Sequence, residues 1–366
     1  MAAGGTGGHM FPAQALAETL RARGWEVALM TDARGRRHAG RIPADPVVEV
    51  AAAPISPRKP VEALRGAAQL ARGVREAKRF IREWRPALVA GFGGYPAFPA
   101  LRAAQSLGLP TILHEQNAVL GRVNRVFARR ATTVASGFEE LGRLPKGVRH
   151  TVVGNPLREQ VLDAVPSGYP PLDGMVNLLV VGGSLGARII AQAVPQAVAR
   201  LPEDLRARLR VVQQTTEGEI ERARAAYARA GVEAELATFF ADIECHLARA
   251  HLVVGRAGAS SVAEFAAMGR PSILVPLAIA TDDHQTANAQ TLARHGAAIV
   301  VPESAFTPDR LADELQRRLK DAPWLESASR AAKAQARPNA ARDLAELVER
   351  TAISPQLSSE PAPEAD

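Results

Sequence analysis

Residues 251–296, HLVVGRAGASSVAEFAAMGRPSILVPLAIATDDHQTANAQTLARHG, contain two successive strand–loop–helix units. The apolar run Leu252–Gly255 predicts a strand buried on both faces, and residues 261–268 predict the helix that follows it. A second apolar strand over residues 272–275 leads to another helix head at residues 282–285. Open parallel sheets bind nucleotides where strand ends meet helix N-termini. This stretch therefore predicts part of an α/β nucleotide-binding domain.

The polar residues of this stretch fit a nucleotide-sugar. Glu264 suits a ribose diol, Arg256 supplies charge, and Gln285 suits sugar hydroxyls. A purely structural role for Glu264 is the alternative, because Ser261 and Glu264 have the spacing of a capping box. On this stretch alone both interpretations stay open.

Length and composition predict a two-domain α/β protein. The 366 residues are too many for one typical core, and the chain is 47% hydrophobic with only 4% aromatic residues. One cysteine, Cys245, excludes a disulfide framework and a cysteine-based zinc site, and its helical, apolar context predicts a buried, inert thiol. No apolar run approaches the length of a transmembrane helix, and the N-terminus lacks a signal-peptide pattern. We therefore expect a cytoplasmic protein.

Charge is distributed unevenly along the chain. The net charge is +7, but residues 1–155 hold 23 Lys/Arg against 11 Asp/Glu, whereas residues 156–366 hold 22 against 27. The two halves therefore meet different partners. A basic half indicates nucleic acid, an anionic membrane surface or phosphate-bearing substrates.

A long helix is predicted over residues 61–85, and it carries part of this positive charge. Apolar residues recur at spacings of four and three and predict a core-facing stripe: Leu70, Val74, Ala77, Ile81 and Trp84. Arginines fall on the opposite face: Arg65, Arg72, Arg75, Arg79 and Arg82. Such a face is either simply solvated or docks on anionic lipid, which contributes about 1 kcal/mol per basic residue near the surface.

A glycine loop, Gly4-Gly5-Thr6-Gly7-Gly8-His9, precedes a predicted helix over residues 11–23. A loop of this kind lets backbone N–H groups approach a phosphate or sugar, although it also suits a tight turn. Such a loop normally follows a central strand, yet only Met1–Ala3 precede it. Each absent buried Val, Leu or Ile forfeits about 1.5–3 kcal/mol, so we expect the native strand to begin upstream of Met1.

Polar residues follow two further predicted strands. Residues 87–90 precede the loop GFGGYP (91–96), and residues 111–113 precede His114-Glu115-Gln116-Asn117, the HEQN tetrad. Polar residues just past strand ends belong to the binding edge of a parallel sheet. The tetrad also suits a hydrogen-bonded clamp on its own loop, and the two roles are compatible.

The second half of the chain repeats the pattern of the first. Residues 163–174, DAVPSGYPPLDG, predict the interdomain linker. A strand over residues 176–181 then runs into Gly182-Gly183-Ser184-Leu185-Gly186 at the head of a helix, an arrangement suited to a diphosphate. The loop lacks the Gly-Lys-Ser/Thr of an ATPase P-loop. No acidic residue lies about 20 positions on at a strand end, which counts against NAD binding. Residues 351–366 are rich in Pro, Ser, Ala and Glu and predict a disordered tail.

Seven motifs occur in the order seen in one protein family: GGTGGH with FPA (4–13), GFGGY (91–95), HEQN (114–117), GNPLR (154–158), GGSLGAR (182–188), RAGASSVAEF (256–265) and DDHQTANA (282–289). Over about residues 2–350 the chain closely resembles the bacterial UDP-N-acetylglucosamine:undecaprenyl-diphospho-muramoylpentapeptide N-acetylglucosaminyltransferases, which make lipid II of peptidoglycan. The resemblance implies an α/β fold with two Rossmann-like domains facing a cleft, the B-type glycosyltransferase fold.

The resemblance also implies how the chain is divided. Residues 1–157 are expected to form the acceptor-facing and membrane-facing domain, and residues 158–334 the domain that binds UDP-GlcNAc. The helix near residues 335–350 is expected to pack back on the N-terminal domain, ahead of a disordered tail over 351–366.

The resemblance implies that the donor, UDP-GlcNAc, is held mainly by the C-terminal domain. Ser184 and the loop from Gly183 to Gly186 would meet the diphosphate, with Arg158 adding charge. Phe240 would read the uracil edge through its main chain.

Three further residues complete the implied donor site. Arg256 would help at the uracil, Glu264 would take the ribose hydroxyls, and Gln285 the GlcNAc hydroxyls. His284 is a departure, because many relatives carry a second glutamine beside Gln285. Sugar selectivity at this position stays open.

The N-terminal domain is implied to supply the chemistry. Thr6, Gly7, Gly8 and Asn117 would approach the donor sugar and the acceptor, and His9 is the candidate general base for the C4 hydroxyl of MurNAc. A helix N-terminus and arginine can stabilise the departing UDP. The sequence has no Asp-x-Asp triad and no His/Cys cluster, so we expect no metal and no other cofactor. A role for His9 in orienting the substrate only is the alternative.

A lipid-linked acceptor, lipid I, implies a peripheral protein on the cytoplasmic face of the bacterial inner membrane. The basic N-terminal half would then dock on anionic phospholipid, mainly through electrostatics, and nucleic acid is not expected as a partner. Three alternatives remain: another UDP-sugar transferase with a lipid acceptor such as diacylglycerol, a UDP-GlcNAc 2-epimerase, and a non-catalytic nucleotide-sugar-binding subunit.

Overall fold

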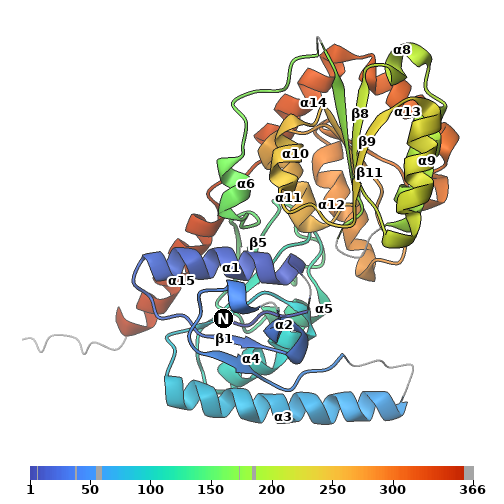
Figure 1. Cartoon of the computed structure of the whole chain (residues 1–366). Coiled ribbons are helices and arrows are strands. Elements are labelled where there is room, and N and C mark those ends of the chain that lie inside the picture. Colours follow the sequence, from blue (N-terminus) through green and yellow to red (C-terminus); the bar gives the residue numbers. More distant parts are fainter. Residues whose placement is uncertain (6, 38, 55–59, 173, 184–186, 358–366) are drawn as a thin grey trace, which may run out of the picture. The chain divides into compact units, whose positions relative to one another are not determined.

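The computed structural model describes the chain except for residues 6, 38, 55–59, 173, 184–186 and 358–366 (Figure 1). It folds as two compact units. Unit 1 is Met1–Arg158 together with the C-terminal stretch from Pro338, and unit 2 is Glu159–Arg337. Each unit is an α/β structure built on parallel strands, as the sequence predicts.

The sheet of unit 1 is parallel throughout its assigned strands. These are β1 (Leu29–Thr31), β2 (Val47–Glu49), β3 (Val89–Gly91), β4 (Thr111–Glu115), β5 (Thr133–Ser136) and β6 (His150–Val152). β1 pairs with β2, and β3, β4, β5 and β6 pair in that order. All carboxyl ends therefore meet at one edge, which is where loops of this fold bind ligands.

Met1–Ala3 lie between the two groups of strands and join them. Ala2 bridges in parallel to Met30 on one side and to Gly91 on the other. Its N–H donates to the Ala90 carbonyl at 2.8 Å, and the Met30 N–H donates to the Met1 carbonyl at 2.9 Å. The first glycine loop therefore follows a segment at the centre of the sheet.

Helices cover both faces of this sheet (Figure 1). They are α1 (Gly7–Ala22), α2 (Ala33–Arg36), the 3₁₀ turn η1 (Ala39–Arg41), α3 (Pro60–Trp84), α4 (Gly94–Ser106), α5 (Arg122–Ala128) and α15 (Ala340–Leu357). α1 and α15 share a core with Ala90 and Ile112, whereas α3, α4 and α5 share one with Val89 and Leu113. Neighbouring residues of a strand point to opposite faces, so each strand contributes to both cores.

α3 has the predicted core stripe, and its packing is unusually close. Leu70, Ala77 and Ile81 are buried. At Gly73 a Cβ would lie 1.9 Å from the carbonyl oxygen of Ala51, so only glycine lets the helix sit there. The next turn is tied to the same residue, because the Ala51 N–H donates to Glu76 Oε2 at 2.9 Å. The arginine face is left exposed.

Unit 2 contains one parallel sheet. Its strands are β7 (Val176–Val181), β8 (Leu209–Gln214), β9 (Glu233–Ala237), β10 (Leu252–Gly255), β11 (Ser272–Leu274) and β12 (Ala298–Val300). Their spatial order is β12-β11-β10-β7-β8-β9, the doubly wound order in which the chain changes direction between β7 and β10. Ligands bind at such a switch point, outside the carboxyl ends of the strands.

Helices cover both faces of this sheet as well. They are α6 (Glu159–Asp163), α7 (Arg188–Ala199), α8 (Glu203–Arg206), α9 (Ile220–Ala230), α10 (Ile243–Arg249), α11 (Ala259–Met268), α12 (His284–Ala293), α13 (Pro308–Leu319) and α14 (Ala322–Ala334), with the 3₁₀ turns η2 (Glu217–Glu219), η3 (Thr281–Asp283) and η4 (Glu303–Ala305). Figure 1 shows α9 and α13 on one side of the sheet and α10, α11 and α12 on the other. Within the described part of the chain, no helix has both the length and the apolarity to cross a membrane.

The predicted linker is wrong. Residues 163–174 belong to unit 2, and the boundary between the units falls after Arg158. Tyr169 and Leu172 pack against the core of unit 2, and the Tyr169 hydroxyl donates to the His251 carbonyl at 2.7 Å. The prolines and glycines suggested a linker, but the aromatic ring and the leucine between them anchor the segment.

Two smaller predictions are also wrong. Cys245 is exposed, because it lies two positions from the buried Leu247 and so points to the opposite side of α10. The expected disordered tail begins too early, since α15 continues to Leu357. The remainder of that tail lies outside the described residues.

Candidate active site

The first glycine loop continues directly into a helix. α1 begins at Gly7, four residues before the predicted start, so Gly7, Gly8 and His9 form its first turn. A Cβ at Gly4 would lie 2.6 Å from Pro96 Cβ, and therefore the loop packs closely on the head of α4. The N–H groups of a first helical turn have no intrahelical partner and suit an anionic group. Thr6 lies outside the described residues.

His9 is half-buried, and one of its ring nitrogens is held. Nδ1 lies 3.1 Å from Oε1 of Gln116 in the HEQN tetrad. The other ring nitrogen, Nε2, faces the backbone of Gly94, where an added Cβ would lie 3.4 Å away. The structure thus joins the first glycine loop, the GFGGY loop and the HEQN tetrad around this ring.

The HEQN tetrad is a clamp, as one of its two predicted roles requires. His114 and Glu115 are the last residues of β4 rather than residues beyond it. Glu115 Oε1 accepts from the N–H and Nδ2 of Asn117 at 3.0 and 3.1 Å, and its Oε2 accepts from the Gly121 N–H at 2.8 Å and Asn124 Nδ2 at 2.9 Å. The buried carboxylate therefore fixes Asn117 at the carboxyl edge of the sheet.

Arg158 is the last residue of the N-terminal segment of unit 1. Its guanidinium lies over the Phe11 ring, 5.0 Å from the ring centroid, in a cation–π contact. Phe11 belongs to α1, so this arginine stays close to the helix that carries His9.

The second glycine loop lies at the switch point of unit 2. Gly183 has a φ of +80°, and a Cβ there would lie 3.9 Å from Arg256 Cβ, so the loops after β7 and β10 are neighbours. α7 follows with Ala187 as N-cap and no side-chain capping hydrogen bond. Ser184 and Gly186 lie outside the described residues.

The helix after β10 starts earlier than predicted, and this bears on Glu264. α11 begins at Ala259, with Gly258 as its N-cap and no side-chain capping hydrogen bond. Ser261 is therefore inside the helix, and Glu264 lies in its second turn, beyond the positions that a capping box uses. The predicted capping role of Glu264 is wrong.

Arg256 is buried, and its guanidinium is engaged in three directions. Nη1 donates to the carbonyls of Val275 at 3.1 Å and Pro276 at 3.3 Å, and Nη2 contacts Glu303 Oε1 at 3.0 Å. Glu303 Oε2 in turn accepts from the Ala278 N–H at 2.9 Å. The hydrogen bond from Arg256 lowers the pKa of the Glu303 carboxyl. Arg256 thus shapes the loop after β11, and sequence reasoning missed Glu303 altogether.

The remaining predicted donor residues lie at the same edge of unit 2. Gln285, in the first turn of α12, accepts from the Leu277 N–H through Oε1 at 3.0 Å. Phe240 is buried, and its ring meets the His246 ring edge-on at 5.0 Å. Both residues follow strand ends, so they share the carboxyl edge with Glu264 and Arg256.

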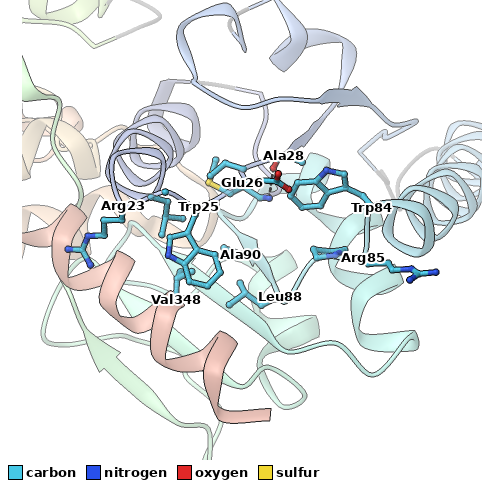
Figure 2. A pocket seen from close by; sticks show the side chains of 15 residues that line it. Arg23, Trp25, Glu26, Ala28, Trp84, Arg85, Leu88, Ala90 and Val348 are labelled. Carbon is cyan, nitrogen blue, oxygen red and sulfur yellow. Dashed lines mark hydrogen bonds between the residues drawn. The ribbon is translucent and has the colours of Figure 1, made fainter. Parts of the chain in front are cut away.

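A separate cavity of about 420 Å³ lies in unit 1, at the amino ends of β1 and β3 (Figure 2). Trp25, Trp84 and Leu88 line it, and the Met1 amine beside it donates to the Ala28 carbonyl at 2.7 Å. Burial lowers the pKa of this amine to about 5. The cavity lies at the edge of the unit 1 sheet opposite to the candidate site residues of that unit, and none of them lines it.

Comparison with known proteins covers both units. Residues 1–136 match the glycosyltransferase family 28 N-terminal domain, and residues 177–344 match the family 28 C-terminal domain. A protein of Maricaulis maris named UDP-N-acetylglucosamine–N-acetylmuramyl-(pentapeptide) pyrophosphoryl-undecaprenol N-acetylglucosamine transferase is 53% identical over 353 residues, which are 95% of this chain and 96% of that protein.

Solved structures give the same result at the level of the fold. The crystal structure of Acinetobacter baumannii MurG superposes with a TM-score of 0.78 at 32% identity and covers 96% of this chain and 98% of its own. Spinosyn forosaminyltransferase SpnP has a TM-score of 0.64 at 15% identity, covering 95% and 96%. That second likeness concerns the fold alone.

Proposed function

The chain belongs to glycosyltransferase family 28, and from this we propose that it transfers GlcNAc from UDP-GlcNAc to the C4 hydroxyl of MurNAc in lipid I, which gives lipid II for peptidoglycan. The observation that carries the proposal is the 53% identity to the Maricaulis transferase, because it extends over 95% of the chain and so includes both units. The expected B-type glycosyltransferase fold is confirmed by the superposition on MurG.

In the proposed reaction, His9 acts as the general base. Its Nε2 takes the proton from the MurNAc C4 hydroxyl as that oxygen attacks C1 of GlcNAc from the face opposite UDP. The bond from C1 to the diphosphate breaks, and UDP leaves with inversion at C1. The half-buried position of His9 in the first turn of α1 supports this role. Its Nδ1 is hydrogen-bonded to Gln116, whereas its Nε2 faces Gly94 and is not used by that contact.

The donor is held by unit 2. The loop from Gly183 to Gly186 and the head of α7 bind the diphosphate. The N-cap residue Ala187 has no polar side chain that could occupy the first N–H groups of the helix, which suit an anion. Glu264 binds the ribose hydroxyls, Gln285 the GlcNAc hydroxyls, and the main chain of Phe240 the uracil.

The other predicted residues assist the donor and the acceptor. Arg158 supports the diphosphate from the end of the N-terminal segment of unit 1, and Asn117 approaches the sugars together with Thr6, Gly7 and Gly8. The engagement of Arg256 with Glu303 favours a role in shaping the loop after β11 over direct contact with the uracil.

We further propose that unit 1 docks on the cytoplasmic face of the bacterial inner membrane through α3. Four basic residues and one acidic residue line a shallow hollow of about 280 Å³ on this helix: Arg75, Lys78, Arg79, Arg82 and Glu83. Near its N-terminal end Val61 and Leu64 are 64% and 74% exposed, a small apolar contribution that the sequence analysis overlooked. A basic face with a small apolar end suits anionic phospholipid.

One assay tests the activity. Labelled UDP-GlcNAc is offered with lipid I, with diacylglycerol and with no acceptor, and we expect label in the lipid fraction with lipid I only. Transfer of label to diacylglycerol would overturn the proposal, as would epimerisation of UDP-GlcNAc in the absence of an acceptor.

The base is tested by His9→Ala. We expect kcat to fall by roughly 10²–10⁴ at saturating substrates. A change confined to KM would reject the role of base in favour of substrate orientation.

A further inference from the structure

A chain of hydrogen bonds runs through unit 1 from a backbone carbonyl to His9. The Gly154 carbonyl oxygen lies 3.0 Å from His114 Nε2. His114 Nδ1 lies 3.1 Å from Gln116 Nε2, and Gln116 Oε1 lies 3.1 Å from His9 Nδ1. A carbonyl oxygen can only accept a hydrogen bond, so the donor and acceptor atoms of the two imidazoles and the amide can be assigned one after another from this end.

The direction of the chain is set at its carbonyl end. His114 is fully buried, and burial lowers its pKa to about 4, so the ring is neutral at physiological pH. A neutral imidazole has one N–H, and a carbonyl oxygen only accepts. The N–H of His114 is therefore on Nε2, and its Nδ1 is an acceptor.

Gln116 passes this direction on. Its Nε2 lies 3.1 Å from the Phe92 carbonyl oxygen as well as from His114 Nδ1, and both of these are acceptors. The amide NH₂ must occupy this position, since exchanging the nitrogen and oxygen would place an acceptor against two acceptors. The Gln116 main chain is held too, because its carbonyl accepts from Asn155 Nδ2 at 2.9 Å. Gln116 Oε1 consequently faces His9 as a pure acceptor.

The last contact determines the tautomer of His9. Because Gln116 Oε1 accepts, His9 Nδ1 carries the proton. In the neutral ring the lone pair is then on Nε2, the nitrogen that faces Gly94 rather than Gln116.

We propose that His114 and Gln116 are positioning residues that hold His9 with its proton on Nδ1 and its lone pair on Nε2, ready to accept the proton of the acceptor hydroxyl. This inference rests on the proposed role of His9 as the base. The partner of His9 is a neutral amide that is itself fixed by a buried neutral imidazole. It selects the tautomer and the ring orientation without supplying a counter-charge.

The first test replaces Gln116 by Met, which has a similar length and no hydrogen-bonding amide. In a catalytic triad, a base held in the wrong tautomer loses about 10⁴ in kcat. With a neutral partner we expect a smaller loss, about 10²-fold in kcat, and a KM for UDP-GlcNAc changed less than about threefold. The matched control is Gln105→Met, which removes a partly buried amide that is hydrogen-bonded to Thr111 and Phe127. We expect this control to leave the kcat of the folded enzyme unaltered.

A spectroscopic readout reports the tautomer directly. Two-bond ¹H–¹⁵N correlation spectra of enzyme labelled on histidine distinguish a protonated Nδ1 from a protonated Nε2, and His9→Gln identifies the signals of His9. We expect the Nδ1–H form alone in the native enzyme and a mixture of both forms in Gln116→Met. A native enzyme with Nε2–H, or a Gln116→Met enzyme with an unaltered tautomer and kcat, would overturn the inference.

The second test separates the two ends of His114. His114→Asn keeps an acceptor near the position of Nδ1, towards Gln116, whereas His114→Gln keeps a donor near the position of Nε2, towards Gly154. If His114 positions Gln116, kcat falls at least tenfold further in His114→Gln than in His114→Asn. The reverse order would assign His114 to the Gly154 contact only and refute the relay.

The two proposals fail in different ways. If His9→Ala leaves kcat intact, His9 is not the base and the proposed mechanism fails. If His9→Ala lowers kcat as expected while Gln116→Met and both His114 variants match Gln105→Met, the base stands and only the relay is refuted.

Discussion

The arginine face of α3 gives the most demanding test of membrane docking. The perturbation is the triple variant Arg75→Gln, Arg79→Gln and Arg82→Gln. These three side chains are exposed, whereas Arg72 is left in place because its Nε contacts Glu76 at 2.7 Å and Glu76 holds the Ala51 N–H. The change therefore removes charge and leaves the packing of α3 on its sheet untouched.

The expected magnitude follows from the charge removed. Each basic residue near an anionic surface contributes about 1 kcal/mol, so three neutralisations cost about 3 kcal/mol, or roughly 150-fold in the dissociation constant for vesicles. The attraction is screened by salt, since the Debye length falls from about 10 Å at 0.1 M to about 3 Å at 1 M. Wild-type binding should weaken accordingly as salt is raised.

The assay is co-sedimentation with vesicles of phosphatidylcholine, with and without phosphatidylglycerol. A control variant of equal charge neutralises Arg222, Arg224 and Arg229 on α9 of unit 2, which are also exposed. We expect the control to bind like wild type. Docking through α3 is refuted if both triple variants lose the same affinity, or if wild type binds neutral vesicles as well as anionic ones.

Three further outcomes test the site and the fold. Glu264→Gln should weaken UDP-GlcNAc binding in calorimetry with an unchanged Tm, because Glu264 does not cap α11; a lowered Tm with intact binding would return it to a structural role. Gly73→Val should destabilise unit 1 by about 3 kcal/mol through overpacking against the Ala51 carbonyl, while Ala71→Val, on the exposed side of the same helix, stays near neutral in urea unfolding. Because burial lowers the pKa of His114 from its ordinary value of 6.5 to about 4 in the folded protein, the unfolded chain binds more protons between these pH values. The free energy of unfolding of wild type should therefore fall as pH is lowered from 6.5 towards 4, and that of His114→Asn should fall less. An equal loss in both proteins between pH 7 and pH 5, measured by urea unfolding, would contradict this.

The course of the strands could be predicted because burial on both faces leaves a plain signal. Leu252–Gly255 and residues 178–181 are continuous apolar segments, and both belong to central strands in the structure. Helix starts were harder. α11 begins after Gly258, and a glycine supplies no side-chain cap that would mark the boundary in the sequence. The sequence predicts that α11 starts at Ser261, because serine is a common N-cap residue, but in the structure Ser261 lies inside the helix.

The site could be predicted as a set of motifs but not as a set of contacts. Glu303 lies 47 positions after Arg256, and nothing local to either residue indicates that they pair. The same holds for Gln116. Its amide is oriented by the Phe92 carbonyl, 24 positions earlier, and the consequence is felt at His9, 107 positions earlier. Contacts of this kind exist only once the sheet has brought several strand ends to one edge.

The return of the chain to unit 1 has a consequence for biosynthesis. Leu344, Ala345 and Val348 of α15 belong to the core beneath α1, and Glu349 accepts from Arg23 Nη1 at 2.7 Å and from Trp25 Nε1 at 3.0 Å. On the ribosome, these groups emerge only after all of unit 2 has been made. At about 5–20 residues per second, unit 1 waits roughly 10–40 s with that flank of α1 uncovered. The second unit of the chain is thus the first that can finish folding, and the earliest helix acquires its α15 neighbour only when synthesis is nearly over.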